Sequence, residues 1–212
     1  MKELNKIIAK KLLQINAIKL SPQNPFTWAS GIKSPIYCDN RVTLSYPTIR
    51  TQIKEGFASI AKNLGEFDHV SGVATAGIAH GALLADHLNL SFSYVRSSAK
   101  KHGRQNKIEG FIPEGSKILV IEDLISTGGS SIDAVNDLRE AGYEVVGVLA
   151  IFTYEFQIAM DNFKKANCKF ATLSNYSSLI VEAQNENYIT DSDAKTLSEW
   201  SNNPNEWFDS NF

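Results

Sequence analysis

Cysteine is scarce in this sequence, with two in 212 residues. Cys38 and Cys168 lie far apart and form no C-x-x-C pair, which argues against a disulfide framework and favours a reducing compartment. Long apolar runs are also missing, because the longest, residues 145–152, is much too short to cross a bilayer. Lysines interrupt the apolar residues of segment 1–13, a pattern typical of an amphipathic helix rather than a signal peptide. We therefore expect a cytoplasmic protein without a membrane partner.

The chain also lacks the excess of positive charge that most nucleic-acid-binding proteins carry. Lysine and arginine number 21 against 23 aspartate and glutamate, a net charge of −2. We therefore expect no nucleic-acid partner. The charge is unevenly spread, however, because residues 96–107 hold five basic residues and no acid, whereas the remaining 16 basic and 23 acidic residues sum to −7. The five basic residues are Arg96, Lys100, Lys101, Arg104 and Lys107.

Hydrophobic residues make up 43% of the chain and aromatic residues 10%, enough for a buried core. From residue 70 onward, apolar runs of strand length alternate with helical patterns, as in a β-α-β sheet. The continuous apolar run 117–121 is typical of a strand buried on both faces of a parallel sheet. We expect strands at residues 70–74, 91–95, 117–121, 144–152 and 169–173. We expect helices at residues 7–15, 48–64, 78–88, 130–141 and 156–167, followed by two polar helices up to about residue 201.

The two ends of the chain fall outside this alternation. Residues 24–35 are rich in turn-forming residues, and residues 202–212 are rich in asparagine and are expected to fray, with Trp207 and Phe208 available for docking. We predict a single α/β domain over residues 1–212, with a central, mainly parallel sheet flanked by helices. Its first 45 or so residues and part of the C-terminal region are expected to form a small hood.

The most informative segment follows the apolar run 117–121. Glu122 and Asp123 stand where that strand is expected to end, and ligands bind beyond the carboxyl ends of strands in such sheets. Small residues then lead into a helix, so backbone N–H groups and the positive end of the helix dipole can bind a phosphate. Glycines let the backbone approach the phosphate, and hydroxyl groups add donors. The turn consists of Ser126, Thr127, Gly128 and Gly129, and the hydroxyl groups of Ser130 and Ser131 follow at the start of the expected helix.

Two adjacent carboxylates beside an anion site indicate a ligand that carries both a phosphate and neutral hydroxyls, such as ribose 5-phosphate. The carboxylates can accept hydrogen bonds from the ribose hydroxyls and can influence where a divalent ion binds. The alternative interpretation, without a ligand, is an acidic strand end followed by an ordinary helix cap. Each of these is common alone, but their occurrence together in this order favours a ligand-binding site. The sequence has neither the Gly-Lys-Ser/Thr of a P-loop nor a G-x-G-x-x-G pattern.

The segment resembles the phosphoribosyl-diphosphate (PRPP) motif of type I phosphoribosyltransferases, in which a hydrophobic strand, an acidic pair and a Thr-Gly turn follow one another. Two further segments resemble the orotate phosphoribosyltransferases. Residues 26–35 (F-T-W-A-S-G-I-K-S-P) are similar to their F-T-x-x-S-G-x-x-S-P segment, and residues 96–103 (R-S-S-A-K-K-H-G) to their mobile loop. The resemblance implies the type I phosphoribosyltransferase fold and a reaction of orotate with PRPP that gives orotidine 5′-monophosphate and pyrophosphate. It also implies Mg²⁺ as cofactor and a homodimer with shared active sites.

By this resemblance, the catalytic residues are Lys100, His102, Glu122 and Asp123. Positive groups of the loop would meet the leaving diphosphate, where preorganised charge stabilises a transition state. No side chain is assigned as a direct Mg²⁺ ligand, because the ion is expected to bind through PRPP near the acidic pair. Ser126 is the predicted orotate contact. The predicted PRPP-binding residues are Arg96, Lys100, His102, Glu122, Asp123, Leu124, Ile125, Ser126, Thr127, Gly128, Gly129 and Ser130.

The sequence departs from the family pattern where substrate-binding cations are expected. Ala29 stands where many members have a lysine, Ala76 replaces the lysine of a Tyr-Lys-Gly turn, and Tyr154 lies where some relatives place an orotate-binding arginine. Lys33 and Arg41 are candidates to supply the missing charge.

Two alternative functions remain open. A phosphoribosyltransferase for another nucleobase would share the PRPP motif but lack the F-T-x-x-S-G-x-x-S-P segment. A PRPP-sensing regulator on the same fold would need a nucleic-acid-binding surface. We expect His69, His80 and His87 at the surface rather than as metal ligands, and both cysteines as small, semi-buried apolar residues.

Overall fold

The computed structural model describes residues 2–28, 31–98, 107–204 and 206–208. Over these residues, the chain forms a six-stranded sheet with the order β10-β9-β8-β5-β6-β7. All neighbouring strands run parallel except β6 and β7, so the predicted mainly parallel sheet is confirmed. The strands are β5 (His69–Val73), β6 (Ser91–Val95), β7 (Ile108–Glu109), β8 (Lys117–Ile125), β9 (Glu144–Thr153) and β10 (Phe170–Asn175).

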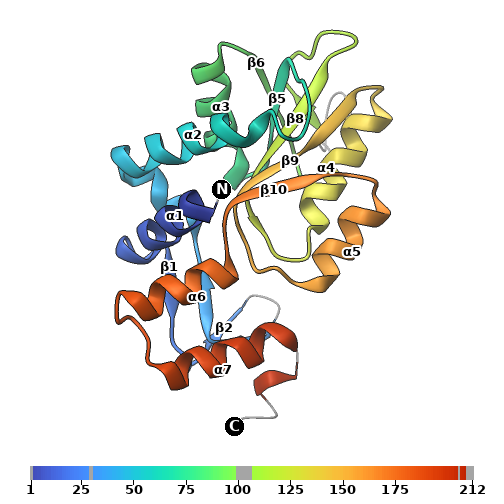
Figure 1. The fold of residues 1–212 in the computed structure, drawn as a ribbon. Helices are drawn as coiled ribbons and strands as arrows, with labels where there is room; N and C mark the ends of the chain where they lie inside the picture. Colours follow the sequence, from blue (N-terminus) through green and yellow to red (C-terminus); the bar gives the residue numbers. More distant parts are fainter. Residues whose placement is uncertain (1, 29–30, 99–106, 205, 209–212) are drawn as a thin grey trace.

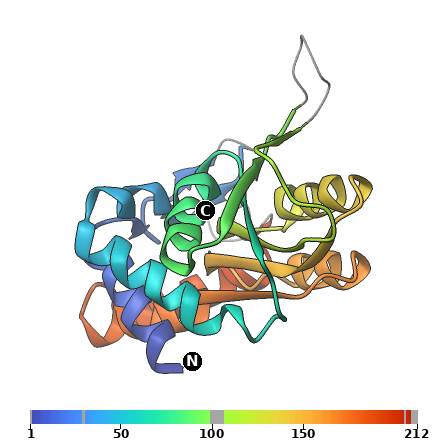
Figure 2. The ribbon, with the colours of Figure 1, turned by 90° about the horizontal axis from the view of Figure 1, so that it is seen from above.

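Helices cover both faces of this sheet, as Figure 2 shows from above. The side chains of β8 alternate between two cores, with Leu119 and Ile121 in the core beneath α1 to α3 and Ile118 and Val120 in the core beneath α4 and α5. No helix in the described ranges has the length and apolar character needed to cross a bilayer. The helices are α1 (Lys2–Gln14), α2 (Pro47–Ala61), α3 (Ala76–Leu88), α4 (Gly129–Glu140) and α5 (Gln157–Lys165).

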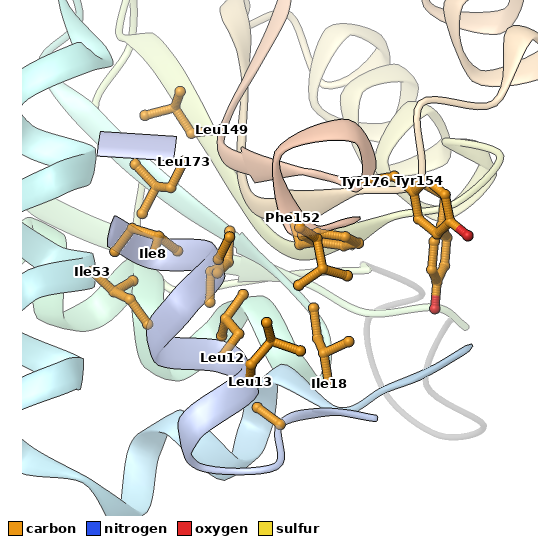
Figure 3. Close-up of a cluster of buried hydrophobic side chains, with 14 of the residues drawn as sticks. Ile8, Leu12, Leu13, Ile18, Ile53, Leu149, Phe152, Tyr154, Leu173 and Tyr176 are labelled. Atoms are coloured by element: carbon orange, nitrogen blue, oxygen red, sulfur yellow. The ribbon is translucent and has the colours of Figure 1, made fainter. Parts of the chain in front are cut away.

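The larger core joins the first helix to the sheet (Figure 3). Ile8 and Leu12 of α1 are 1% and 0% exposed, and they belong to the same cluster as Ile53 of α2, Leu149 of β9 and Leu173 of β10. Burying one such side chain stabilises the fold by about 1.5–3 kcal/mol. The N-terminal segment is thus part of the main layer of helices.

A further group of elements, which we call the hood, lies below the sheet in Figure 1. In the hood, β1 pairs antiparallel with β4, and β2 pairs antiparallel with β3. A 3-10 helix, η1, leads from β4 to α2. The elements of the hood are β1 (Ile18–Leu20), β2 (Phe26–Thr27), β3 (Lys33–Ser34), β4 (Ile36–Cys38), η1 (Asn40–Ser45), α6 (Tyr176–Asn185) and α7 (Asp191–Asn202).

The structure corrects several boundaries expected from the sequence. The strands β1 to β4 were not predicted, because strands of two or three residues are too short to show a periodic pattern. Strand β8 continues to Ile125, so Glu122 and Asp123 lie within the strand instead of beyond its end. Trp207 docks on the fold, an outcome the sequence analysis left open, because it is only 3% exposed and packs in the larger core.

Two of the histidines expected at the surface are buried. The ring nitrogens of His69 lie 2.7 Å from Ser91 Oγ and 2.9 Å from Ser93 Oγ, on the neighbouring strand β6. His80 Nε2 lies 3.4 Å from Thr43 Oγ1 in η1. Burial lowers the pKa of both histidines, that of His80 to about 4, so both rings are neutral at pH 7.

Helix α3 packs so closely on β8 that glycine is required at the contact. A Cβ atom at Gly77 would lie 2.3 Å from the carbonyl oxygen of Ile121. We predict that Gly77→Ala lowers the free energy of unfolding by about 3 kcal/mol, because backbone must move to relieve the overlap. Urea unfolding followed by circular dichroism measures this difference.

Gly129→Ala is the matched control, because its new Cβ atom would have only Thr127 Oγ1 within 4 Å, at 3.8 Å. That variant is expected to be as stable as the wild type or slightly more stable. Equal unfolding midpoints for the two variants would contradict the predicted overlap at Gly77.

Candidate active site

Glu122 is the more deeply buried of the two acids, with 5% of its surface exposed. Its Oε1 accepts a hydrogen bond from the backbone N–H of Asp123 at 3.0 Å, and its Oε2 accepts bonds from Ser130 Oγ at 3.4 Å and Ser131 Oγ at 3.5 Å. Burial, together with the charge of Asp123, raises the pKa of Glu122 to about 8. A cation brought to this carboxyl group would favour its charged form again.

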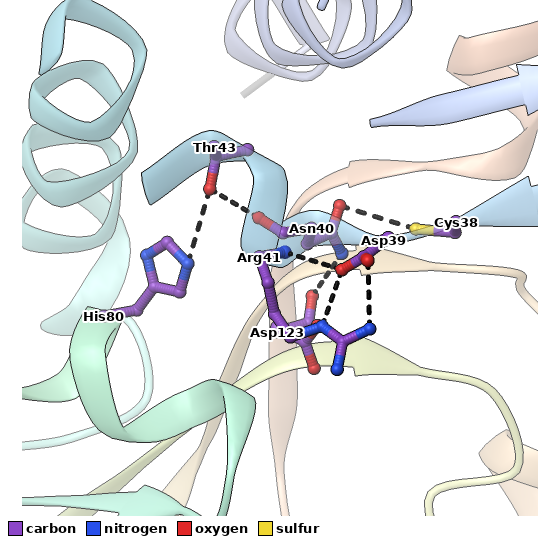
Figure 4. Close-up of polar contacts among 7 residues, drawn as sticks. All are labelled: Cys38, Asp39, Asn40, Arg41, Thr43, His80 and Asp123. Atoms are coloured by element: carbon purple, nitrogen blue, oxygen red, sulfur yellow. Dashed lines mark hydrogen bonds and ion pairs between the residues drawn. The ribbon is translucent and has the colours of Figure 1, made fainter. Parts of the chain in front are cut away.

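Asp123 is half-buried and is joined to the hood through its backbone. Asn40 Nδ2 donates a hydrogen bond to the carbonyl oxygen of Asp123 at 2.8 Å (Figure 4). Burial raises the pKa of Asp123, whereas hydrogen bonding with Glu122 and the charge of Arg41 lower it. Arg41 itself is held by Asp39, with Nε 2.6 Å from Oδ1 and Nη2 2.9 Å from Oδ2. The site thus combines a carboxylate pair with a nearby cation that already has a partner.

The turn between β8 and α4 leads directly into a helix N-terminus. Gly128 is the N-cap residue of α4, with a φ of +80°, and no side chain in the described residues caps this end. A Cβ atom at Gly128 would lie 2.7 Å from the Phe163 ring, so both the backbone angle and the packing require glycine. Asn162 Nδ2 donates to the carbonyl oxygen of Thr127 at 3.0 Å and fixes the turn. The uncapped N–H groups are suited to bind an anion.

A small cavity of about 90 Å³ lies beside this turn. Ser130 at the start of α4, Arg96 after β6, and Ala74 before α3 line it together. Two of the predicted PRPP-binding residues, Arg96 and Ser130, are therefore brought together here. Ala76 begins α3 just beyond Ala74 and does not line the cavity, whereas Lys107 does.

The first and last basic residues of the stretch 96–107 each form an ion pair with a carboxylate. Arg96 Nη1 lies 3.5 Å from Glu109 Oε1, and Lys107 Nζ lies 2.8 Å from Asp137 Oδ1 of α4. The positive charge of residues 96–107 is therefore partly neutralised by residues distant in sequence. The predicted catalytic residues Lys100 and His102 lie outside the described residues and stay predictions.

A second cavity of about 280 Å³, which we call the aromatic pocket, lies between the hood and the end of β8. Trp28 and Tyr154 form part of its wall, with ring centroids 5.4 Å apart. Trp28 Nε1 donates to the carbonyl oxygen of Ile36 at 3.0 Å, which fixes the ring. All of the lining residues are uncharged in their ordinary forms at pH 7: Thr27, Trp28, Tyr37, Cys38, Leu124, Ser126 and Tyr154.

The predicted PRPP-binding residues of the turn take different positions around the end of β8. Ser126 and Leu124 line the aromatic pocket, whereas Thr127 and Gly129 are exposed in the turn. Ile125 is 0% exposed and packs its side chain in the core beneath α4 and α5. Its contribution to a ligand site is thus limited to its backbone, whose carbonyl oxygen accepts a hydrogen bond from Tyr154 N at 3.2 Å.

The sequence analysis did not predict Trp28, Tyr37 and Cys38 as site residues. They lie within or just after the segment 26–35, which matches the family pattern. The position of that segment could therefore have indicated that they belong to the site. Asn40 was missed as well, because nothing in its sequence neighbourhood indicates a bond to Asp123. The described residues contain no group of three or more histidine, cysteine, aspartate or glutamate side chains that could hold a metal ion by themselves.

Comparison with known proteins identifies the family of the chain. Residues 45–181 match the model of the phosphoribosyl transferase domain, which defines the class of the protein. The chain is 54% identical over 205 residues to the orotate phosphoribosyltransferase of Listeria monocytogenes serovar 1/2a, covering 96% of this chain and 98% of that one. It is 52% identical over 208 residues to the enzyme of Porphyromonas gingivalis, covering 98% and 99%. The chain belongs to the orotate phosphoribosyltransferase family.

Solved structures share the fold. UMP synthase of Leishmania donovani superimposes with a TM-score of 0.78 at 26% identity, over 92% of this chain and 42% of that one. Orotate phosphoribosyltransferase of Aeropyrum pernix gives 0.74 at 24% identity, over 86% and 99%. An adenine phosphoribosyltransferase also matches, with a TM-score of 0.62. The predicted phosphoribosyltransferase fold and a pentosyl-transferring activity are confirmed, and the choice of base rests on the closer sequence relatives.

The raised pKa of Glu122 gives a testable dependence of stability on pH. Because the folded carboxyl titrates near 8 and an unfolded one near 4.5, the folded state binds more protons between these values, and stability falls as pH rises. We predict that Glu122→Gln removes this loss and raises the free energy of unfolding at pH 8 by on the order of 2 kcal/mol. Urea unfolding between pH 5 and pH 8 measures the slope.

The control is Glu55→Gln, which neutralises an exposed glutamate of α2. Its pH dependence is expected to match that of the wild type. A slope for Glu122→Gln equal to that of the wild type would show that the buried carboxyl group does not titrate in this range.

Proposed function

We propose that the chain transfers the 5-phosphoribosyl group of PRPP to orotate in the cytoplasm, giving orotidine 5′-monophosphate and pyrophosphate for pyrimidine nucleotide synthesis. The bond from the ribose anomeric carbon to the diphosphate breaks, and a bond from that carbon to a ring nitrogen of orotate forms. That nitrogen loses its proton, which the departing pyrophosphate or water accepts. The observation that carries this proposal is the position of Ser126. It lines the aromatic pocket, while residues 127–130 directly after it form the turn that can bind a phosphate.

The ribose phosphate is proposed to bind at the end of β8. The uncapped N-terminus of α4 offers N–H groups to the 5-phosphate, and Ser130 adds a hydroxyl donor. Asp123 and Glu122 accept hydrogen bonds from the ribose hydroxyls. The small cavity between Arg96, Ala74 and Ser130 then receives part of the diphosphate, with the Arg96 guanidinium at its side.

The base is proposed to bind in the aromatic pocket, against Trp28 and Tyr154. Flat aromatic walls suit a planar ring, and Ser126 can hydrogen-bond to a polar edge of that ring. Mg²⁺ is the proposed cofactor: it would bind through the phosphates of PRPP near the acidic pair, since it prefers oxygen ligands and is usually held largely by substrate phosphates. When bound, the ion neutralises charge on the leaving diphosphate.

Positive groups of the loop are proposed to complete the diphosphate site. Lys100 and His102 provide charge that interacts more strongly as the pyrophosphate leaves, which lowers the barrier rather than only strengthening substrate binding. In this proposal the loop reaches the active site of the partner subunit, so the working form is a homodimer.

A substrate panel read by ultraviolet absorbance tests the proposed reaction. We expect orotate to be consumed in the presence of protein, PRPP and Mg²⁺, and a chelator to stop the reaction. Adenine, guanine and hypoxanthine are expected to remain unchanged. If the protein converts a purine but not orotate, the proposal is wrong and the protein is a phosphoribosyltransferase for another nucleobase.

Mixed mutant subunits test the shared site. Lys100→Ala and Asp123→Ala are each expected to lower kcat by about a hundredfold or more, because each removes charge that acts on the transition state. After subunit exchange, the equal mixture should regain about a quarter of the wild-type activity, since half of the dimers then have one intact site. Verified exchange without recovery would contradict a site built from two subunits.

A further inference from the structure

The aromatic pocket has a charge mismatch with the substrate proposed for it. Orotate is a pyrimidine that carries a carboxylate, whereas none of the described residues that line the pocket is a lysine or an arginine. Moving an anion from water into a largely apolar cavity is costly unless a cation or several donors compensate the charge. Tyr154, at the position where some relatives have an arginine, provides a hydroxyl group but no positive charge. A cation from just outside the described lining would compensate this charge.

Lys33 on β3 is placed to provide that cation. Its Nζ donates a hydrogen bond to Thr27 Oγ1 at 2.7 Å, and Thr27 lines the aromatic pocket. Its ammonium group also lies 5.7 Å from the ring centroid of Phe208. No carboxylate in the described part of the chain forms an ion pair with Lys33. The ammonium group of Lys33 is thus joined by one hydrogen bond to a residue of the pocket lining, and it forms no ion pair with a described carboxylate.

Arg41 is the other candidate, and its contacts argue against it. Two of its nitrogens are bound by the Asp39 carboxylate, and its side chain is 61% exposed. Its charge acts on Asp123, on the ribose side of the site, and it does not line the aromatic pocket. Using Arg41 for an orotate carboxylate would require the Asp39 pair to break.

We infer that Lys33 determines specificity for an anionic base, by binding the carboxylate of orotate at the rim of the aromatic pocket beside Thr27. This inference rests on the proposed function. The flexible stem of lysine lets the ammonium group leave Thr27 Oγ1 or bridge it to the incoming carboxylate. Phe208 keeps the charged group near the rim through its ring face. The pocket then accepts a flat ring by shape and selects an acidic one by charge.

Lys33→Gln tests the charge separately from the hydrogen bond, because glutamine keeps a donor for Thr27 without a positive charge. We expect the KM for orotate to rise about tenfold or more, as for loss of a charge-assisted hydrogen bond, while the KM for PRPP stays within about twofold. Lys33→Arg should retain most of the wild-type KM, and Lys33→Met should behave like the glutamine variant. The control Lys19→Met removes an exposed lysine from β1 of the same hood and should change neither constant.

Calorimetric binding of uracil, which lacks the carboxylate, separates recognition from a structural role. Uracil affinity is expected to be the same for the wild type and Lys33→Gln, so that the preference for orotate over uracil falls about tenfold. An unchanged KM for orotate, or an equal loss of orotate and uracil binding, would overturn the inference. If the wild type fails to convert orotate at all, the proposed function is wrong irrespective of Lys33.

Discussion

The burial of two adjacent carboxyl groups in the middle strand of the sheet is the constraint on which the rest of the structure depends. Glu122 has little access to water, and its remaining hydrogen bonds come from Asp123 and from the first turn of α4. Such an arrangement raises the pKa of the group and costs stability at neutral pH, because the charged form is poorly solvated. Its retention in the centre of a close-packed sheet is explained by ligand binding, since a PRPP-bound cation and ribose hydroxyls would provide the partners that the fold alone does not.

The two halves of the site have different origins. The half proposed to bind the ribose phosphate is built from the sheet itself, at the end of β8 and the start of α4. The half that would hold the base comes from the hood, where Trp28 and Tyr37 face a pocket closed on the other side by Tyr154 of the segment after β9. Since Thr27, Trp28, Tyr37 and Cys38 of the hood line this pocket, we expect substitutions in the hood to affect the choice of base more than the binding of the ribose phosphate.

Strong local patterns made part of this structure predictable from the sequence. The run 117–121, the acidic pair and the glycine turn indicate strand, turn and helix within a short span, so α4 was predicted to within one residue at each end and the start of β8 was predicted correctly, although β8 extends four residues further. The burial of His69 was not predictable, because its serine partners lie 22 and 24 residues further along and meet it only when β5 and β6 pair. The pairing of Lys107 with Asp137 depends on the sheet in the same way. The hood strands are too short for any periodicity to show.

The short helix η1 has a consequence for protein engineering. Thr43 Oγ1 donates to the carbonyl oxygen of Asn40 at 2.6 Å and contacts His80 of α3, while Asn40 is bonded to the backbone of β8 (Figure 4). The helix η1 thus contacts both α3, through His80, and β8, the strand that carries the acidic pair. A hood taken from a relative to change the base specificity would bring its own η1 with it. Poor packing of that η1 against α3 and β8 would then disturb the acidic pair, which the exchange is intended to preserve. Chimeras are therefore best cut before β4 rather than between η1 and α2.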